Sequence, residues 1–265
     1  MVMKDNFKKS VGNLARKLGY EIIPVSRIMP RDLAQHLNSL FRIVNVSCVL
    51  DVGANIGQYR DFLRNQAKYE GLIVSFEPVE KAVNVLRKKA KTDSRWLIYH
   101  CAVASQSGVN RINVMKADDL SSFLPPDSSA TNLFAHCNVI DHTEDVHVVT
   151  LDSALSELRT RQNIGDRFFL KMDTQGYDLE VLRGAEKNLS QISALQTELS
   201  CVRLYKGMPG YLEVLEALDM RGFQLSGLFP VTQDTLLRVI EADCVMISRA
   251  QVNTAKLNLT WTRGV

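Results

Sequence analysis

The stretch VLDVGANIGQY at residues 49–59 decides the fold of this chain. It joins an apolar run at 46–52 through a glycine-containing turn to a predicted helix at 57–67. A second apolar run, LIVSF at 72–76, is followed by another predicted helix at 79–90. Apolar strands that are separated by helices indicate a parallel sheet, buried on both faces and built from strand–helix–strand units.

The rest of the chain continues this alternation. Further strands are predicted at 96–104, 109–115, 146–151, 168–172 and 192–199, with a terminal hairpin at 223–229 and 243–248. Further helices are predicted at 152–160, 177–189 and 211–220. Residues 117–145 show no clear periodicity, and a loop of that length is usually functional or mobile. The sum is a doubly wound α/β sheet with small additions.

Length and composition are those of an ordinary globular chain. Of the 265 residues, 46% are hydrophobic and 23% are charged, which is typical of a soluble domain and excludes a disordered chain. The five cysteines are widely spaced and form no C-x-x-C pair, so neither a disulfide framework nor a zinc knuckle is implied. The formal net charge of +3 requires no nucleic-acid partner, and we expect none.

The positive charge is concentrated at the N-terminus. Residues 1–31 contain seven lysines and arginines against two acidic residues. Within them, residues 4–18 have the spacing of a short amphipathic helix that ends before Gly19. Its apolar stripe could pack on the domain, which is the commoner arrangement, or the basic helix could rest on an anionic membrane or glycolipid surface.

These features divide the chain into an N-terminal helical extension at 1–45, a main domain at 46–250 and a C-terminal tail at 251–265. No apolar run approaches the roughly 18 residues that a membrane-spanning helix needs. The N-terminus is polar where a secretory signal would have its apolar core. The expected location is therefore the cytoplasm.

The turn after the first strand predicts a ligand site, because ligands of such sheets bind beyond the carboxyl ends of the strands. Asn55 stands where a dinucleotide fingerprint has its middle glycine, and Gly57 arrives one residue early. Both departures disfavour a pyrophosphate. Together with Gly53, the turn still brings backbone N–H groups and a helix N-terminus to a smaller anion, such as an amino-acid carboxylate.

Two carboxylates complete the predicted cofactor site. Asp51, at the end of the first strand, could accept a hydrogen bond from an ammonium group or its bridging water. Glu77 follows the second strand, where a carboxylate can accept both hydroxyls of a ribose. An anion site, a cation site and a ribose clamp together describe S-adenosylmethionine. Alternatively, Gly53 and Gly57 only shape a tight turn and Glu77 caps a helix.

Five runs of the chain follow the pattern of one known family: VLDVGANIGQY (49–59), SFEPV (75–79), VTLD (149–152), FLKMDTQGYDLEVLRGA (169–185) and LQTELSCVRLYKG (195–207). Through them, residues 46–248 resemble the FkbM-type S-adenosylmethionine-dependent methyltransferases. The resemblance implies a Rossmann-like class I methyltransferase fold, a mostly parallel seven-stranded sheet with an antiparallel C-terminal strand. It also implies O-methylation, and acceptors in this family are typically sugar or polyketide hydroxyls.

An alkyl hydroxyl becomes a methyl acceptor only with a general base or a metal that lowers its pKa. Asp173 ends the fourth parallel strand beside the expected cofactor site and is our first choice for the base. Glu198 could hold the acceptor hydroxyl, or share a divalent metal with Asp173, although no ligand spacing supports a metal site. Asp173 could instead cap a helix, and Glu198 could pair with Lys171 or Arg203.

Other residues are assigned to the substrate and to the adenine. Gln175 could orient the substrate. Ser121 and Ser122 match a Ser-Ser element at a similar place in the family, where they could donate hydrogen bonds to a sugar. Ala102 lies in the run CAVA at 101–104, which we expect to pass under the adenine because small side chains leave room for a flat ring.

Several acidic residues and histidines keep open roles. Asp118, Asp119 and Asp127 are candidate partners of the adenine amino group, with no choice among them. His136 and His142 could act as bases or metal ligands, but solvated loop histidines are commoner.

The sequence therefore predicts a cytoplasmic S-adenosylmethionine-dependent O-methyltransferase, with a sugar hydroxyl of a polysaccharide or glycolipid as the favoured acceptor. The alternatives are a nicotinamide-dependent oxidoreductase and a catalytically silent binding module of the same fold. One departure weakens the transfer of acceptor identity: RVIEAD at 238–243 lacks the Gln that many sugar-modifying relatives carry before the matching Asp.

Overall fold

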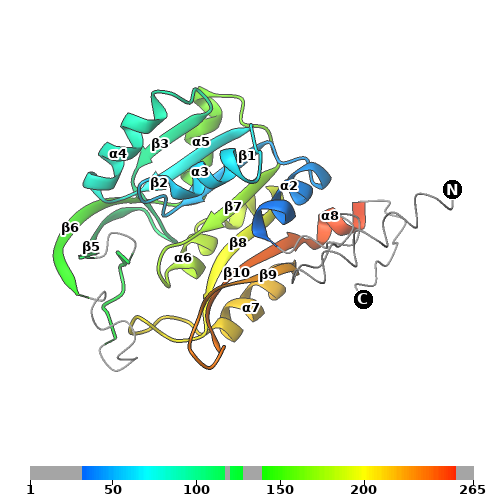
Figure 1. The fold of residues 1–265 in the computed structure, drawn as a ribbon. Helices are drawn as coiled ribbons and strands as arrows, with labels where there is room; N and C mark the ends of the chain where they lie inside the picture. Colours follow the sequence, from blue (N-terminus) through cyan, green and yellow to red (C-terminus); the bar gives the residue numbers. More distant parts are fainter. Residues whose placement is uncertain (1–31, 117–119, 128–138, 255–265) are drawn as a thin grey trace, which may run out of the picture. The chain divides into compact units, whose positions relative to one another are not determined.

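The main sheet has seven strands in the order β3-β2-β1-β7-β8-β10-β9 (Figure 1). The computed structural model describes residues 32–116, 120–127 and 139–254. The strands are β1 (Cys48–Val52), β2 (Leu72–Glu77), β3 (Trp96–His100), β7 (Phe168–Met172), β8 (Ile192–Ser200), β9 (Phe223–Gln233) and β10 (Val239–Ser248). The pairs among β1, β2, β3, β7 and β8 are parallel, whereas β10 runs antiparallel to both β8 and β9. The predicted fold is confirmed.

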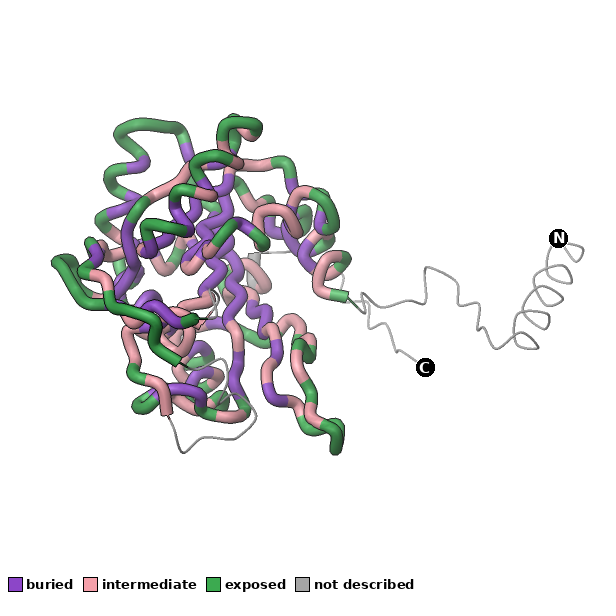
Figure 2. The backbone as a smooth tube through the Cα atoms, turned by 60° about the vertical axis from the view of Figure 1, so that its left-hand side comes forward, coloured by how far each residue is buried: buried purple, intermediate pink, exposed green. Residues whose placement is uncertain are grey.

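Helices cover both faces of this sheet because its strands are apolar on both sides. Leu50 of β1 packs in a cluster with α5 (Leu151–Arg161), α6 (Asp178–Arg183) and α7 (Tyr211–Met220). Its neighbour Val49 packs in a second cluster on the opposite face, with α2 (Leu33–Ile43), α3 (Gln58–Asn65) and α4 (Glu80–Ala90). Figure 2 shows the buried residues concentrated in the strands between these layers.

Helix α2 packs against the sheet, although it lies within the range 1–45 that the sequence assigned to an extension. It begins after Asp32, whose Oδ1 accepts a hydrogen bond from the Gln35 N–H at 2.7 Å. Phe41 makes an edge contact with Phe169 of β7, with ring centroids 4.8 Å apart. The predicted basic helix at 4–18 lies outside the described residues, and the last helix, α8 (Arg249–Thr254), crosses the predicted start of the tail.

A second sheet, of three strands in the order β4-β6-β5, corrects the prediction for residues 96–151. Its strands are β4 (Ala102–Val103), β5 (Gly108–Met115) and β6 (Ile140–Val149). The predicted strand 96–104 is broken at Cys101, and its second part leaves the main sheet. Strand β6 begins within the stretch that was predicted as a loop. The prediction missed its first half because the residues after Ile140 are polar and mostly exposed and so carry no apolar alternation.

The predicted helix at 177–189 is also interrupted. Helix α6 ends at Arg183, and a 3₁₀ helix, η2 (Glu186–Gln191), follows. Gly184 lies at the junction, where a Cβ atom would be 2.2 Å from the carbonyl oxygen of Ala104. This close approach places the helix end against the second sheet. Within the part of the chain that the structure describes, no helix is long and apolar enough to cross a membrane.

The substitution Gly57→Ala should destabilise the protein strongly. Gly57 precedes α3 with a φ of +89°, and an added Cβ would lie 2.7 Å from Cη2 of Trp96. We expect a loss of about 1–2 kcal/mol from the left-handed backbone and a further loss of about 1–3 kcal/mol from overpacking. Urea unfolding, followed by circular dichroism, measures the sum of the two losses as a decrease in the free energy of unfolding.

Gly222→Ala is the matched control, because Gly222 has a φ of +85° and nothing within 4 Å of its added Cβ. Its free energy of unfolding should decrease only by the cost of the left-handed backbone. Equal losses in the two variants would contradict the packing of Trp96 against this turn.

Candidate functional site

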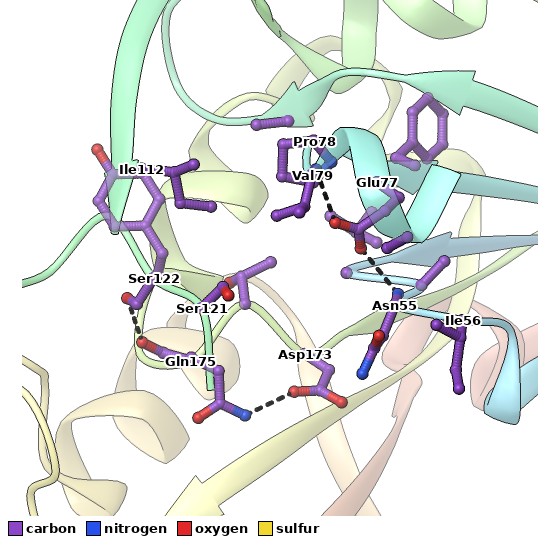
Figure 3. A pocket seen from close by; sticks show the side chains of 18 of the residues that line it. Asn55, Ile56, Glu77, Pro78, Val79, Ile112, Ser121, Ser122, Asp173 and Gln175 are labelled. Atoms are coloured by element: carbon purple, nitrogen blue, oxygen red, sulfur yellow. Dashed lines mark hydrogen bonds between the residues drawn. The ribbon is translucent and has the colours of Figure 1, made fainter. Parts of the chain in front are cut away.

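A cavity of about 880 Å³ lies beyond the carboxyl ends of β1, β2, β7 and β8 (Figure 3). Loops that follow these strands supply one part of its wall, and the second sheet supplies another. Its lining includes Gly53, Asn55, Glu77, Ala102, Ser121, Ser122, Asp173, Gln175 and Glu198. The tertiary structure therefore brings nine of the predicted site residues to one cavity, whose volume suits a small-molecule cofactor with room for a substrate.

The turn after β1 approaches the loop after β7 at Gly53. This residue has a φ of +80°, and an added Cβ would lie 1.9 Å from the carbonyl oxygen of Asp173. The Asp173 N–H in turn donates to the carbonyl of Val52 at 3.1 Å. A side chain at position 53 would push these two loops apart. Gly57 is absent from the cavity lining and packs against Trp96 instead.

The N–H groups of this turn are directed to protein acceptors. Those of Gly53 and Ala54 donate to the carbonyl of Phe76, at 3.0 and 3.2 Å. The Asn55 N–H donates to Glu77 Oε2 at 2.7 Å, and the Val79 N–H donates to Oε1 at 2.9 Å. The predicted anion site consisted of the N–H groups of this turn and the helix N-terminus, and of these the N–H groups of residues 53–55 donate to protein acceptors. These N–H groups donate to Phe76 and Glu77 at the end of β2. The turn is therefore hydrogen-bonded to the carboxylate that was predicted to bind the ribose.

Glu77 is a buried carboxyl group at the wall of the cavity. Burial raises its pKa to about 7, although the two backbone N–H donors oppose this shift. Both carboxylate oxygens keep lone pairs for further donors, such as the hydroxyls of a ribose. The group therefore combines a fixed orientation with a charge that changes near neutral pH.

Asp51 lies below the turn and does not line the cavity. The parallel register places it beside Ser75 of β2 and Lys171 of β7. Ser75 Oγ donates to Asp51 Oδ2 at 2.8 Å, and Lys171 Nζ lies 3.5 Å from Oδ1. The side chain that was expected to contact the ligand thus supports the turn from beneath, where it is fully buried.

Lys171 links three parts of the site. Its Nζ lies 3.2 Å from Asp173 Oδ2 and donates to the carbonyl of Gly53 at 3.3 Å, besides its contact with Asp51. Burial alone would lower the pKa of Lys171, but the charges of Asp173 and Asp51 raise it above its usual range. The amine therefore stays charged. The sequence reasoning had placed Lys171 only as a partner of Glu198.

Asp173, Gln175 and Glu198 converge. Gln175 Nε2 lies 3.1 Å from Asp173 Oδ1 and 3.5 Å from Glu198 Oε2. Asp173 remains 38% exposed, so it can reach a ligand in the cavity. Burial, followed by the charges of Asp173 and Glu241, raises the pKa of Glu198 well above its ordinary value. The partly exposed Asp173 and the more buried Glu198 therefore both contact the side-chain amide of Gln175.

Three polar residues at this end of the cavity were missed by the sequence reasoning. The Tyr59 hydroxyl donates to Gln196 Oε1 at 2.7 Å, and Gln196 Nε2 donates to Asp243 Oδ1 at 2.8 Å. All three residues line the cavity. The available signal was a polar side chain within an apolar strand, because Gln196 interrupts the apolar run of β8 and has to be hydrogen-bonded there.

The opposite wall is mostly apolar. Ala102 and Val79 belong to a buried cluster with Ile112, and all three line the cavity. Ser121 Oγ accepts a hydrogen bond from the Met115 N–H at 3.3 Å. Ser122 Oγ donates to the carbonyl of Gln175 at 2.8 Å, so donation to a sugar would require this bond to break.

The remaining candidates lie at the rim or outside the described residues. His142 lines the rim, and its contacts with Glu144 and Asp141 raise its pKa above the ordinary value. Asp127 is described but does not line the cavity. The open roles of Asp118, Asp119 and His136 fall outside the described residues.

Across residues 32–116, 120–127 and 139–254, no group of three or more histidine, cysteine or acidic side chains is placed to hold a metal ion. The pair of Asp173 and Glu198 as metal ligands stays an expectation from the sequence.

Comparison with known proteins identifies the family. The model of the methyltransferase FkbM domain matches residues 51–225, which is more than half of the chain. None of the curated proteins compared with this chain matches its sequence.

Solved structures that resemble this chain do so at low identity. The methyltransferase FkbM from Methylobacillus flagellatus KT is 17% identical with a TM-score of 0.47, and the match covers 77% of this chain and 44% of that one. A putative O-methyltransferase from Klebsiella pneumoniae is 12% identical with a TM-score of 0.44, over 91% of this chain and 88% of that one. Magnesium protoporphyrin IX methyltransferase from Synechocystis PCC 6803, solved with bound SAM, is 13% identical with a TM-score of 0.39, over 81% and 79%.

This chain thus spans less than half the length of the Methylobacillus protein. The domain match alone carries the assignment, and it agrees with the five sequence runs. The chain belongs to the methyltransferase FkbM family.

Proposed function

We propose that this protein transfers a methyl group from S-adenosylmethionine to a hydroxyl of a sugar in a polysaccharide or glycolipid. The observation that carries the proposal is the arrangement of two carboxyl groups in one cavity. Glu77 is fixed by the turn after β1, and Asp173 is fixed by its contact with the same turn at Gly53. A donor held by the first group would therefore lie in the same cavity as the second.

The cavity fits the donor on its own chemistry. A side chain at position 53 would collide with the Asp173 carbonyl, so Gly53 lets the turn and the loop after β7 enclose one cavity, which Asn55 also lines. Glu77 would hold the ribose hydroxyls, and the apolar wall at Val79 and Ala102 would hold the adenine. When bound, the cofactor supplies a methyl group on a positively charged sulfur.

The chain's own residues then prepare the acceptor. Asp173 takes the proton from the acceptor hydroxyl, because it is the exposed carboxylate of the converging pair. Lys171 and Gln175 each hold one of its oxygens, so that a lone pair can point into the cavity. Glu198, which retains a proton near neutral pH, donates a hydrogen bond to an acceptor oxygen.

The groups at this end of the cavity support a carbohydrate as the acceptor. Carboxyl and amide side chains of Asp173, Gln175, Gln196 and Asp243 can accept hydrogen bonds from several hydroxyls at once. A carbohydrate offers such a row of hydroxyls. From the sequence we also expect the protein to act in the cytoplasm. Contact of the basic segment 4–18 with a membrane or glycolipid surface is a second expectation from the sequence that belongs to this proposal.

Calorimetry separates this proposal from an oxidoreductase. The full chain should bind S-adenosylhomocysteine and should not bind NAD, because the turn lacks the middle glycine that lets a pyrophosphate approach. Tight binding of NAD without binding of S-adenosylhomocysteine would remove the methyltransferase proposal.

The affinity for S-adenosylhomocysteine should rise with pH. Ribose hydroxyls donate to the ionised form of Glu77, whose pKa is raised to about 7. Ionisation between pH 6 and pH 8 would increase the competent fraction about tenfold, so the dissociation constant should fall by about that factor. Isothermal calorimetry at several pH values measures it.

Glu77→Gln is the control for this pH dependence. The variant keeps an acceptor oxygen but cannot ionise, so its weaker binding should change little over the same range. A wild-type dissociation constant that is constant between pH 6 and pH 8 would contradict the role of Glu77.

Asp173→Asn should abolish turnover and spare the cofactor. The amide keeps the size of the side chain but cannot accept the proton, so methyl transfer should fall at least about 100-fold. The dissociation constant for S-adenosylhomocysteine should stay within about twofold, because Asp173 contacts the acceptor. Transfer of tritiated methyl to a panel of glycans measures turnover.

Asp145→Asn is the matched control, since Asp145 forms an exposed ion pair with Arg111 and does not line the cavity. Its turnover should equal that of the wild type. Normal turnover in Asp173→Asn would show that the base lies elsewhere.

A further inference from the structure

The acceptor end of the cavity adjoins an apolar mouth. The mouth is formed by Leu33 of α2, Tyr59 and Phe62 of α3, and Val231 of β9, all of which line the cavity. These three elements are far apart in the sequence, so only the tertiary structure brings the side chains to one cavity. Donor binding and proton transfer, as proposed above, leave all four side chains without a role.

An aromatic pair joins this mouth to the polar groups of the acceptor end. The Tyr59 hydroxyl donates to Gln196 Oε1 at 2.7 Å, and Gln196 Nε2 donates to Asp243 Oδ1 at 2.8 Å. The Phe62 ring stacks on the Tyr59 ring, with centroids 5.8 Å apart and an interplanar angle of 29°. The apolar surface therefore begins where the hydrogen-bonding groups end.

Helix α2 and strand β9 contact each other beside the cavity. His36 Nε2 lies 3.0 Å from Ser226 Oγ, and the His36 ring centroid is 5.2 Å from that of Phe229. Leu33 lies about one helical turn before His36, and Val231 follows Phe229 in the same strand. Both side chains line the cavity, so the contact between α2 and β9 fixes two members of the mouth.

A β-bulge lies at Val231. Pro230 of β9 pairs with Ala242 of β10. Thr232 pairs with Glu241, which is adjacent to Ala242 in β10. Val231 is therefore the extra residue of the bulge, and bulges near binding sites redirect a side chain. This one places an apolar side chain, 54% exposed, at the opening of the cavity.

The position of the mouth indicates what covers it. Because it adjoins the acceptor end, a molecule that brings a hydroxyl to Asp173 and extends past Gln196 reaches it. The side chains of Leu33, Phe62 and Val231 carry no hydrogen-bonding atoms, so a further sugar ring would find no partners on them for its hydroxyls. A hydrocarbon chain needs no such partners and is stabilised when it leaves water.

We propose that the acceptor is a glycolipid whose hydrocarbon chain lies on the apolar mouth of Leu33, Tyr59, Phe62 and Val231 while its sugar occupies the acceptor end. The inference rests on the proposed function, because it chooses between the two acceptor classes named there. Binding of the chain can be tested without methyl transfer.

The probes are n-octyl β-D-glucoside, kept below the concentration at which it forms micelles, and methyl β-D-glucoside, which has the same sugar without the chain. Calorimetry with the full chain measures both dissociation constants. Octyl glucoside should bind at least about tenfold more tightly, a factor that burial of about two methylene groups supplies. Saturating S-adenosylhomocysteine should change this affinity by no more than about twofold, because the chain and the donor occupy different parts of the cavity.

Val231→Asp should lower the affinity for octyl glucoside at least about tenfold, because a carboxylate under the chain would lose water without gaining a partner. Leu228→Asp is the matched control, since Leu228 belongs to the same strand, is 52% exposed and does not line the cavity. Its affinity for octyl glucoside should equal that of the wild type. Leu33→Gln should weaken binding in the same direction as Val231→Asp and replaces that variant if it does not fold.

Equal affinities for the two glucosides, or no measurable binding of octyl glucoside, would overturn this inference. Tighter binding of maltotetraose than of octyl glucoside would overturn it in favour of a polysaccharide. Displacement of octyl glucoside by S-adenosylhomocysteine would also overturn it, because the chain would then lie in the donor site, and so would equal losses in Val231→Asp and Leu228→Asp.

Tritiated methyl transfer separates this inference from the proposed function. Where a sugar is methylated, its octyl glycoside should have a kcat/KM at least about tenfold above that of its methyl glycoside. Absence of methyl transfer to every glycan and glycolipid offered would count against the proposed function and leave the chain-binding result valid.

Discussion

A buried ammonium group holds the cofactor turn and the proposed base in one arrangement. Lys171 Nζ contacts Asp51 from β1, the carbonyl of Gly53 in the turn and Asp173 after β7. A charge that is taken out of water is tolerated only where partners compensate it, and removal of one partner leaves the others uncompensated. The three segments are therefore constrained together. Because Gly53 has no side chain, the Asp173 backbone can approach closely enough for this contact to form.

Lys171 belongs to a row of polar side chains that crosses the sheet. Parallel register places Ser75, Asp51, Lys171 and Gln196 side by side on β2, β1, β7 and β8. Each of them has a polar contact to a neighbour or, for Gln196, to Tyr59 of α3 and Asp243 of β10. Burial of such a row is costly unless its members are hydrogen-bonded. Lys171 and Gln196 of this row line the cavity, so they make that part of its wall polar.

The two ends of the cavity differ in kind because two different sheets build them. The main sheet ends in carboxyl and amide groups, of which Asp173 and Glu198 reach the cavity. The second sheet contributes apolar side chains such as Ala102 and Ile112. This separation supports the proposed function, in which the flat ring of the donor would contact the second wall and the hydroxyls of the acceptor would contact the first.

The sequence by itself determined the strands of the main sheet, because continuous apolar runs between helical segments have few other folds. It also determined that Glu77 and Asp173 lie at the carboxyl ends of parallel strands, which share one edge of the sheet. It did not reveal β6, whose exposed first half lacks alternation, or the contacts of Lys171 and Gln196. Only the tertiary structure decided that Asp51 supports the turn from below while Asp173 faces the cavity. The physical reason is that register and burial, which depend on contacts between distant segments, set which partner each polar group meets.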